Sequence, residues 1–125
     1  MATIVVLDDV EDAGVLLKRI LERQGHQVWA FSEEEDAIRH VAGKGADLAI
    51  LDIKLKKMTG VEVLVEMKKH APDLKIIMLT GYPTLETARE ALRLGVNEYC
   101  VKPIDKEELE AKVAQVLNPE QKQGV

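Results

Sequence analysis

The sequence predicts an α/β fold in which a parallel five-stranded sheet is covered by helices on both faces. Five short apolar runs alternate strictly with stretches whose apolar residues recur at helical spacing. The apolar runs are continuous rather than alternating, which is typical of strands buried on both faces. The clearest run, residues 46–52, ends abruptly on the carboxylate of Asp52. We therefore expect five β-α units with right-handed crossovers.

The composition is that of one globular domain. The 125 residues include 46% hydrophobic and 31% charged residues, but only 3% aromatics, so the core must be aliphatic. A net charge of -5 argues against direct nucleic-acid binding. No stretch approaches the ~18 apolar residues of a membrane span, and the first apolar run is too short for a signal peptide. We therefore expect a cytoplasmic domain without membrane contact.

The first two β-α units have clear boundaries. Residues 3–7 and 27–31 predict strands. Acidic residues at 8–12 favour the start of the first helix, and Gly25 stops it. Ser32 and Glu35 stand three apart, as in a capping box, and predict the start of the second helix. That helix ends in the turn at 43–45.

The third and fourth units follow the same pattern. A third strand ends at Asp52, and a lysine-rich loop at 53–58 leads to Thr59 and Glu62, a second capping box. The third helix should bury its apolar positions, Val61, Leu64, Val65 and Met67. Residues 75–79 predict a strand, and Thr84 is the expected N-cap of the fourth helix. That helix has a small apolar face, so we expect it to pack least firmly and to be the moving part.

Residues 98–101 predict the last strand, and the single cysteine, Cys100, lies within it as a buried, inert thiol. Asp105 and Glu108 resemble a capping box at the start of the fifth helix, and Asn118 and Pro119 end it. We predict a domain over residues 1–118, with residues 119–125 as a polar tail or the start of a linker.

Polar residues follow the strands where an open α/β sheet collects ligands, namely Asp8, Asp9, Asp52, Thr80 and Lys102. Three carboxylates within a few ångströms cannot all stay ionised unless positive charge is near. One carboxyl group could be protonated and act as a general acid, or the cluster could bind a divalent cation. Oxygen ligands without a His or Cys cluster favour Mg²⁺. A simpler alternative is that Asp8 and Asp9 only cap the first helix.

The remaining strand ends fit a phosphoryl group. Pro103 makes a cis peptide possible, which would orient Lys102. An ammonium, the Thr80 hydroxyl and a free backbone N–H at Gly81 are the groups that bind phosphoryl oxygens. The sequence therefore predicts phosphoryl transfer onto a carboxylate, with Asp52 as the nucleophile. Mg²⁺ and Lys102 would neutralise the charge on the transferring oxygens.

From about residue 3 to residue 118, the chain resembles the response-regulator receiver domains of two-component signalling. The resemblance rests on the order and spacing of the following residues: Asp8, Asp9, Asp52, Thr80, Gly81, Tyr99, Lys102 and Pro103. It implies a flavodoxin-like, doubly wound sheet with strand order 2-1-3-4-5. It also implies that Asp52 accepts a phosphoryl group from a sensor histidine kinase.

The resemblance assigns further roles. Asp9, Asp52 and the backbone carbonyl of Lys54 would ligate Mg²⁺, and Asp8 would act mainly through a bound water. Thr80 would swing toward the phosphoryl group, which Lys102 binds, and Tyr99 would move from an exposed to a buried rotamer. The fourth helix, fifth strand and fifth helix would then control an output domain or a partner, or form a homodimer. Such a domain is not an enzyme, although it assists its own phosphotransfer and autodephosphorylation.

The chain departs from the family in the loop after Asp52. Lys56 and Lys57 stand where the family often has Pro and Gly, and Thr59 replaces a frequent Asp. The rigid turn of the family is therefore not expected here. Tyr82, like Lys54, occupies a position that tunes hydrolysis of the phosphoaspartate, and it could either shield the acyl phosphate or simply pack on its loop. Residues 80–83 also resemble receivers attached to transcription-activator ATPases.

Three other functions compete with a receiver. A haloacid-dehalogenase-type hydrolase would need a second Asp two residues after the nucleophile, where this chain has Lys54. A nucleotide or flavin module lacks support because no glycine-rich phosphate-binding motif is present. A phosphorylation-independent interaction module would not need the complete acidic set, but the lysine-rich loop keeps this alternative open.

Overall fold

A computed structural model describes residues 1–53, 55 and 57–119. Five parallel strands form one sheet in the order β2-β1-β3-β4-β5, as the resemblance implies. The strands are β1 Thr3–Leu7, β2 Gln27–Phe31, β3 Leu48–Leu51, β4 Lys75–Thr80 and β5 Glu98–Val101. The helices are α1 Glu11–Arg23, α2 Glu34–Lys44, α3 Gly60–His70, α4 Leu85–Arg93 and α5 Lys106–Leu117.

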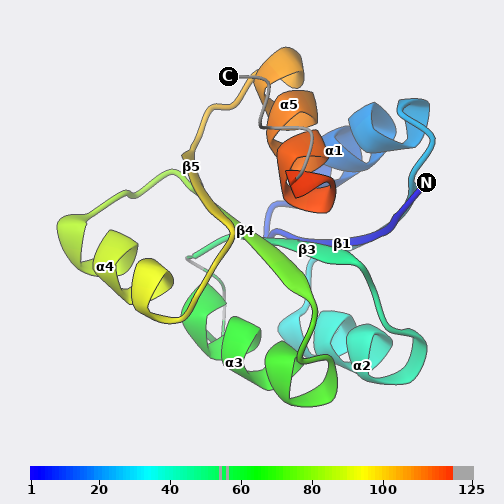
Figure 1. Ribbon diagram of the computed structural model, residues 1–125. Coiled ribbons are helices and arrows are strands. Elements are labelled where there is room, and N and C mark those ends of the chain that lie inside the picture. Colours follow the sequence, from blue (N-terminus) through cyan, green and yellow to red (C-terminus); the bar gives the residue numbers. More distant parts are fainter. Residues whose placement is uncertain (54, 56, 120–125) are drawn as a thin grey trace.

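The sheet separates two apolar cores. Figure 1 shows α1 and α5 on one face of the sheet and α2, α3 and α4 on the other. Successive strand residues point to opposite faces, so Val5 and Leu7 pack with α2 and α3 while Ile4 and Val6 pack with α1 and α5. All four residues of β3 are buried. The continuous apolar runs are therefore explained by helices on both sides, and the predicted fold class is confirmed.

Most of the predicted helix starts are confirmed. In α3, the Glu62 N–H donates to Thr59 Oγ1 at 3.1 Å and the Thr59 N–H donates to Glu62 Oε1 at 2.8 Å. Asp105 Oδ1 accepts from the Glu108 N–H at 2.7 Å at the start of α5. The predicted box at Ser32 is wrong. The N-cap of α2 is Glu33, whose side chain makes no capping hydrogen bond.

The two helices that flank β4 differ in how much they bury. In α3 the buried apolar side chains are Val63, Leu64 and Met67, whereas Val65 faces solvent, contrary to the prediction. In α4, Ala91 is the only buried one of the nine residues that the structure describes there, and Leu92 is 73% exposed. The prediction that the fourth helix packs least firmly is consistent with this burial.

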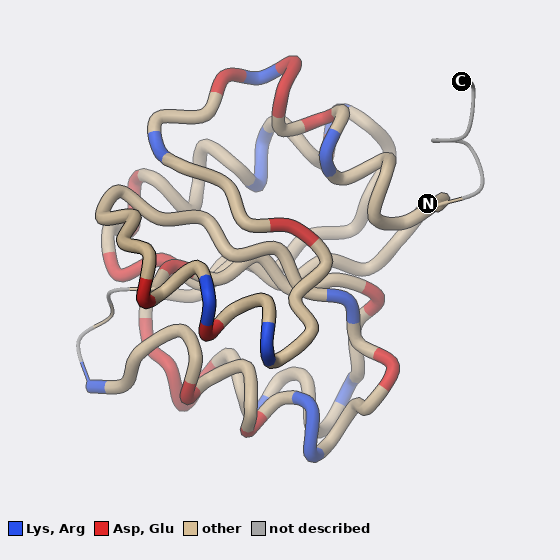
Figure 2. The backbone as a smooth tube through the Cα atoms, turned by 60° about the vertical axis from the view of Figure 1, so that its left-hand side comes forward, with Lys and Arg blue, Asp and Glu red and all other residues tan. Residues whose placement is uncertain are grey.

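Charged residues lie along the outer surfaces of the helices, with acidic and basic positions interspersed (Figure 2). Inside, Cys100 is buried as predicted, and burial together with the nearby charge of Glu98 raises the pKa of its thiol. Within the part of the chain that the structure describes, we find no helix with the length and apolarity that a bilayer crossing requires.

Candidate functional site

Three carboxylates meet where β1 and β3 end. Leu7 pairs with Leu51 in the parallel ladder, so the residues that follow them, Asp8 and Asp52, leave the sheet side by side. Carboxylate oxygens of Asp8, Asp9 and Asp52 all lie within 4.8 Å of one another. Asp8 and Asp52 are buried and Asp9 is partly exposed. The predicted acidic cluster is therefore present.

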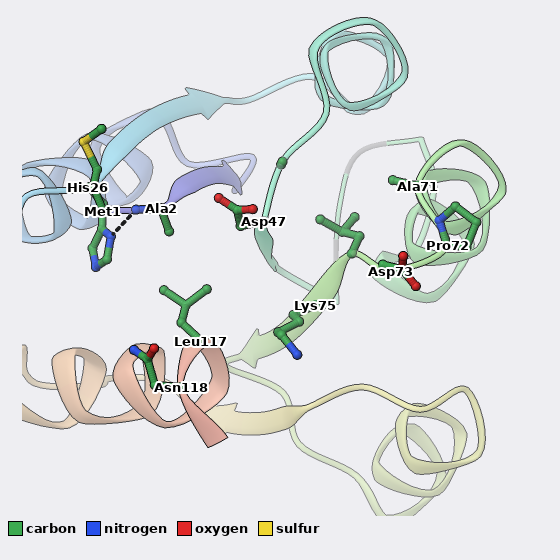
Figure 3. Close-up of a pocket in the computed structure, with 12 residues that line it drawn as sticks. Met1, Ala2, His26, Asp47, Ala71, Pro72, Asp73, Lys75, Leu117 and Asn118 are labelled. Carbon is green, nitrogen blue, oxygen red and sulfur yellow. Dashed lines mark hydrogen bonds between the residues drawn. The ribbon is translucent and has the colours of Figure 1, made fainter. Parts of the chain in front are cut away.

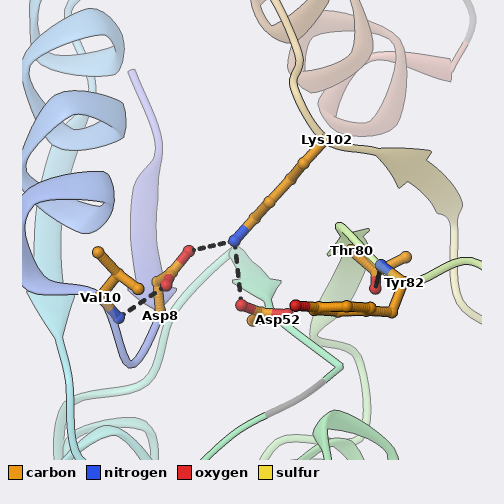
Figure 4. A network of polar contacts seen from close by, with 6 residues as sticks. All are labelled: Asp8, Val10, Asp52, Thr80, Tyr82 and Lys102. Atoms are coloured by element: carbon orange, nitrogen blue, oxygen red, sulfur yellow. Dashed lines mark hydrogen bonds and ion pairs between the residues drawn. The ribbon is translucent and has the colours of Figure 1, made fainter.

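Asp8 also stabilises the start of α1 by a hydrogen bond. Its Oδ1 accepts a hydrogen bond from the backbone N–H of Val10, the N-cap residue, at 2.9 Å. Its Oδ2 faces the cluster instead (Figure 4). The helix-capping alternative therefore accounts for one oxygen of Asp8 and leaves the other for the site.

Lys102 supplies the positive charge that the carboxylates require. Its Nζ lies 2.7 Å from Asp8 Oδ2 and 3.0 Å from Asp52 Oδ2 (Figure 4). Burial of the ammonium works to lower its pKa, but the hydrogen bonds and the charges of the two carboxylates outweigh burial, so the pKa of Lys102 is raised. The Lys102–Pro103 peptide is cis. The Lys102 ammonium thus contacts two carboxylates that lie 94 and 50 residues before it in the sequence.

Thr80 and Gly81 lie at the end of β4, beside this cluster. Thr80 is fully buried, and its Oγ1 accepts a hydrogen bond from the Tyr82 N–H at 2.9 Å. The backbone N–H of Lys102 donates to the Thr80 carbonyl at 2.7 Å. The Thr80 hydroxyl is therefore engaged within its own loop in this structure.

The acidic cluster opens into a cavity of about 420 Å³. Its lining includes Asp9, Asp52, Gly81, Tyr82 and Lys102. Tyr82 is 65% exposed, and its side chain extends across the strand ends toward Asp52 (Figure 4). The ring of Tyr82 therefore borders the space that a substituent on Asp52 would occupy.

A second cavity, of about 500 Å³, lies at the opposite end of the strands, where they begin (Figure 3). His26, Asp47, Lys75 and Asn118 are among its lining residues, and His26 Nδ1 accepts from the Ala2 N–H at 3.1 Å. It contains none of the predicted site residues.

Tyr99 lies on β5 and contacts the first turn of α4. Its side chain is partly buried, and its hydroxyl lies 2.8 Å from Thr87 Oγ1. Thr87 also completes the cap of α4, since its N–H donates to Thr84 Oγ1 at 3.0 Å. Sequence reasoning identified Tyr99 but not Thr87, whose hydroxyl links the predicted switch tyrosine to the helix that is expected to move.

Two other residues near the site were missed. The carboxylate of Glu34 is buried and accepts backbone hydrogen bonds from Lys57 and Met58. Gly60 packs so closely that a Cβ there would lie 2.3 Å from the carbonyl oxygen of Asp52. A glycine in the first turn of a predicted helix, where it is intrinsically unfavourable, is a signal that could have found this contact. The predicted carbonyl ligand, Lys54, lies outside the described residues.

Comparison with known proteins decides the family. The family model for the response regulator receiver domain matches residues 4–114. The chain belongs to this family. The receiver is 37% identical over 117 residues to the DNA-binding transcriptional regulator NtrC of Azospirillum brasilense, covering 94% of this chain and 24% of that protein. It is 32% identical over 114 residues to the transcriptional regulatory protein ZraR of Klebsiella oxytoca, covering 91% and 26%.

Solved structures agree with this assignment. A CheY-like receiver domain protein from Methanospirillum hungatei JF-1 matches with a TM-score of 0.92 at 31% identity, covering 99% of both chains. NtrX from Brucella abortus matches with a TM-score of 0.87 at 29% identity, covering 98% of this receiver and 28% of that chain. This receiver thus spans about a quarter of the length of the first curated relatives, NtrC and ZraR included.

Family membership carries a general function. Receiver domains are regulatory phosphoacceptor domains of two-component response regulators rather than enzymes in the ordinary sense. They are phosphorylated by histidine kinases, are linked to output domains, and generally bind Mg²⁺ at an acidic cluster. The match therefore favours a receiver over the hydrolase and nucleotide-binding alternatives.

Proposed function

We propose that this receiver is a phosphorylation-activated switch in which Asp52 accepts a phosphoryl group from a sensor histidine kinase. The observation that carries the proposal is the carboxylate of Asp52, which borders an open cavity and is hydrogen-bonded to Lys102. An oxygen of Asp52 would attack phosphorus, forming an O–P bond as the N–P bond to the kinase histidine breaks and the imidazole nitrogen takes the electron pair. A carboxylate nucleophile needs no general base.

The donor set fits Mg²⁺. All three clustered side chains offer carboxylate oxygens, which a hard cation prefers. As the family resemblance implies, Asp9 and Asp52 would be direct ligands and Asp8 would act mainly through water; both oxygens of Asp8 already accept hydrogen bonds, from Val10 and Lys102. Bound Mg²⁺ would supply charge neutralisation on the transferring oxygens. The Lys54 carbonyl stays a predicted ligand.

The switch would follow from hydrogen bonds that only one loop arrangement allows. The Thr80 hydroxyl would leave the Tyr82 N–H and, with Lys102, bind the phosphoryl oxygens. Gly81 would offer its backbone N–H, and Tyr82 would shield the acyl phosphate. Tyr99, bonded to Thr87, would couple this movement to α4. Little energy is needed to move α4, because Ala91 is the only buried residue among those that the structure describes in this helix.

The output surface would be α4, β5 and α5. Exposed apolar side chains lie on this surface, namely Leu85, Leu92 and Val101. Apolar groups that gather on an exposed face favour contact with a partner. The surface would therefore serve an output domain, a partner or a second copy of the receiver.

The decisive experiment is intact mass measurement and peptide mapping after incubation with acetyl phosphate, with and without Mg²⁺. We expect one Mg²⁺-dependent phosphoryl group on Asp52, and none in Asp52→Asn. If folded protein stays unlabelled both by acetyl phosphate and by a panel of histidine kinases, the proposal is wrong and a phosphorylation-independent interaction module is favoured.

A second experiment tests the switch. Thr80→Ala should still be labelled but should no longer dimerise or bind its partner on phosphorylation, measured by sedimentation velocity. Thr80→Ser keeps the hydroxyl and is the matched control. Normal coupling in Thr80→Ala would remove Thr80 from the mechanism. The domain boundary at residue 118, a cytoplasmic location and the lack of nucleic-acid contact stay predictions.

A further inference from the structure

One buried carboxylate lies outside the acidic cluster. In the described part of the chain, the buried polar or charged residues are Asp8, Asp52, Thr80 and Glu34. The first three belong to the site, whereas Glu34 is the first residue of α2 and is only 1% exposed. Because burial of a carboxylate is unfavourable unless hydrogen bonds compensate, the side chain must have strong partners.

The partners of Glu34 are two successive backbone N–H groups in the loop after Asp52. Glu34 Oε2 accepts from the Lys57 N–H at 2.5 Å and from the Met58 N–H at 2.9 Å. Burial alone would raise the pKa of Glu34, but these N–H groups and the charge of Lys57 outweigh it, so the pKa is lowered. Hydrogen bonds to an ionised acceptor are about twice as strong as neutral ones.

The same loop is fixed to Asp52 at its other end. The Gly60 N–H donates to the Ile53 carbonyl at 2.8 Å, and Gly60 packs against the carbonyl of Asp52. Between these points, the sequence of residues 53–59 contains neither proline nor glycine, the two residues with the strongest backbone preferences in turns. The carboxylate of Glu34 therefore fixes the backbone at Lys57 and Met58, in the loop that follows the phosphoacceptor.

The arrangement of the helices makes this contact possible. Figure 1 shows α2 beside α3, on the same face of the sheet. The start of α2 thus faces the connection that enters α3. A neighbouring acid of α2, Glu35, is exposed and lies 3.6 Å from the Lys57 ammonium, which is a weak surface pair by comparison.

We propose that Glu34 is a positioning residue for the phosphoacceptor site. By fixing the backbone at Lys57 and Met58, it holds the loop after Asp52 in the arrangement that lets the cluster of Asp8, Asp9 and Asp52 bind Mg²⁺. The inference rests on the proposed function, because the bound cation matters only if the cluster supports phosphoryl transfer. It assigns to one side chain of α2 the role of fixing the backbone at Lys57 and Met58.

The test compares Glu34→Ala and Glu34→Gln with wild type and with Glu35→Ala, the matched control. Groups that orient metal ligands change metal affinity about 10- to 100-fold when they are removed. We expect Glu34→Ala to raise the Mg²⁺ concentration for half-maximal labelling by acetyl phosphate about 10-fold. The labelling rate at saturating Mg²⁺ should change much less. Glu34→Gln keeps an oxygen at the same reach and should give an intermediate shift.

Two further readouts do not depend on labelling. Isothermal titration with Mg²⁺ alone should show the same order of affinities. Hydrogen exchange of the Lys57 and Met58 amides in metal-free protein should accelerate in Glu34→Ala and not in Glu35→Ala. If Glu34→Ala does not fold, Glu34→Gln decides the question by the same measurements.

The possible failures are distinguishable. Wild-type protein that binds Mg²⁺ but is never phosphorylated would overturn the proposed function, and the titrations would still show whether Glu34 sets affinity. Labelling of wild type with the same Mg²⁺ dependence in the Glu34 and Glu35 variants would overturn the inference about Glu34 alone.

Discussion

The helices α3 and α4 cover the same face of the sheet, and each begins with a threonine capping box, yet they are held very differently (Figure 1). Packing of α3 includes buried Val63, Leu64 and Met67, and Gly60 lies against the backbone of Asp52. Packing of α4 includes buried Ala91 alone among its described residues. Local capping therefore determines where a helix begins, whereas tertiary packing determines how firmly it stays.

The largest expected effect contrasts a buried residue of α3 with an exposed residue of α4. Met67→Ala removes a fully buried side chain and should lower the free energy of unfolding by about 2–5 kcal/mol. Leu92→Ala removes a side chain that is 73% exposed and should stay within about 0.5 kcal/mol of wild type. Urea denaturation monitored by circular dichroism measures both. Equal losses would mean that α4 is as firmly packed as α3.

The second prediction concerns the close contact at the start of α3. In Gly60→Ala the new Cβ would meet the Asp52 carbonyl, so we expect a loss of about 1–3 kcal/mol in the free energy of unfolding. Gly43→Ala in α2 is the matched control, because nothing lies within 4 Å of its Cβ and alanine favours helices. A stable Gly60→Ala variant with unchanged labelling of Asp52 would show that this contact is dispensable.

A smaller effect is expected at the start of α4. Thr87→Val keeps the shape of the side chain but removes the hydroxyl that accepts from the Thr84 N–H and contacts Tyr99, which should cost about 1 kcal/mol locally. Faster hydrogen exchange in α4, with α3 unaffected, is the expected result. Tyr99→Phe removes only the tyrosine hydroxyl and should give part of this change. Uniform acceleration in both helices would argue against a separately mobile α4.

The smallest expected effect is the titration of Glu34, which takes place only in acid. Its pKa is lowered from an ordinary value of 4.5, so the unfolded chain takes up protons more readily on acidification. The stabilisation of the folded state by the Glu34 carboxylate is therefore complete at neutral pH and is lost as the pH falls below 4.5. The difference in unfolding free energy between wild type and Glu34→Gln should shrink over that range. A constant difference would show that the charge of Glu34 contributes nothing.

The fold was predictable because local signals and tertiary structure agree. The apolar run of β3 is buried along its whole length, and the caps at Thr59 and Asp105 start helices where expected. The acidic cluster was predictable for a geometric reason, since parallel strands bring residues such as Asp8 and Asp52 to one edge.

What could not be predicted depends on contacts between distant segments. Glu34 stands in an acidic run at a helix start, where local reasoning assigns capping, but its partners lie 23 and 24 residues away. Val63 is buried in α3 where the sequence predicted Val65, because the buried side of the helix depends on how the helix is rotated against the sheet. The link between Thr87 and Tyr99 likewise needs the three-dimensional arrangement of α4 and β5.

The ammonium of Lys102 also fixes the formal charge of the cavity. Three clustered carboxylates and one ammonium leave an excess of two negative charges, which is the charge that one divalent cation cancels. Phosphorylation of Asp52 would remove one carboxylate charge while the phosphoryl oxygens add about two. The loaded site would thus change by about one charge in total. Such a modest change in charge is sufficient only if the responding element loses little packing energy when it moves. Helix α4, with its single buried alanine among the described residues, meets that condition.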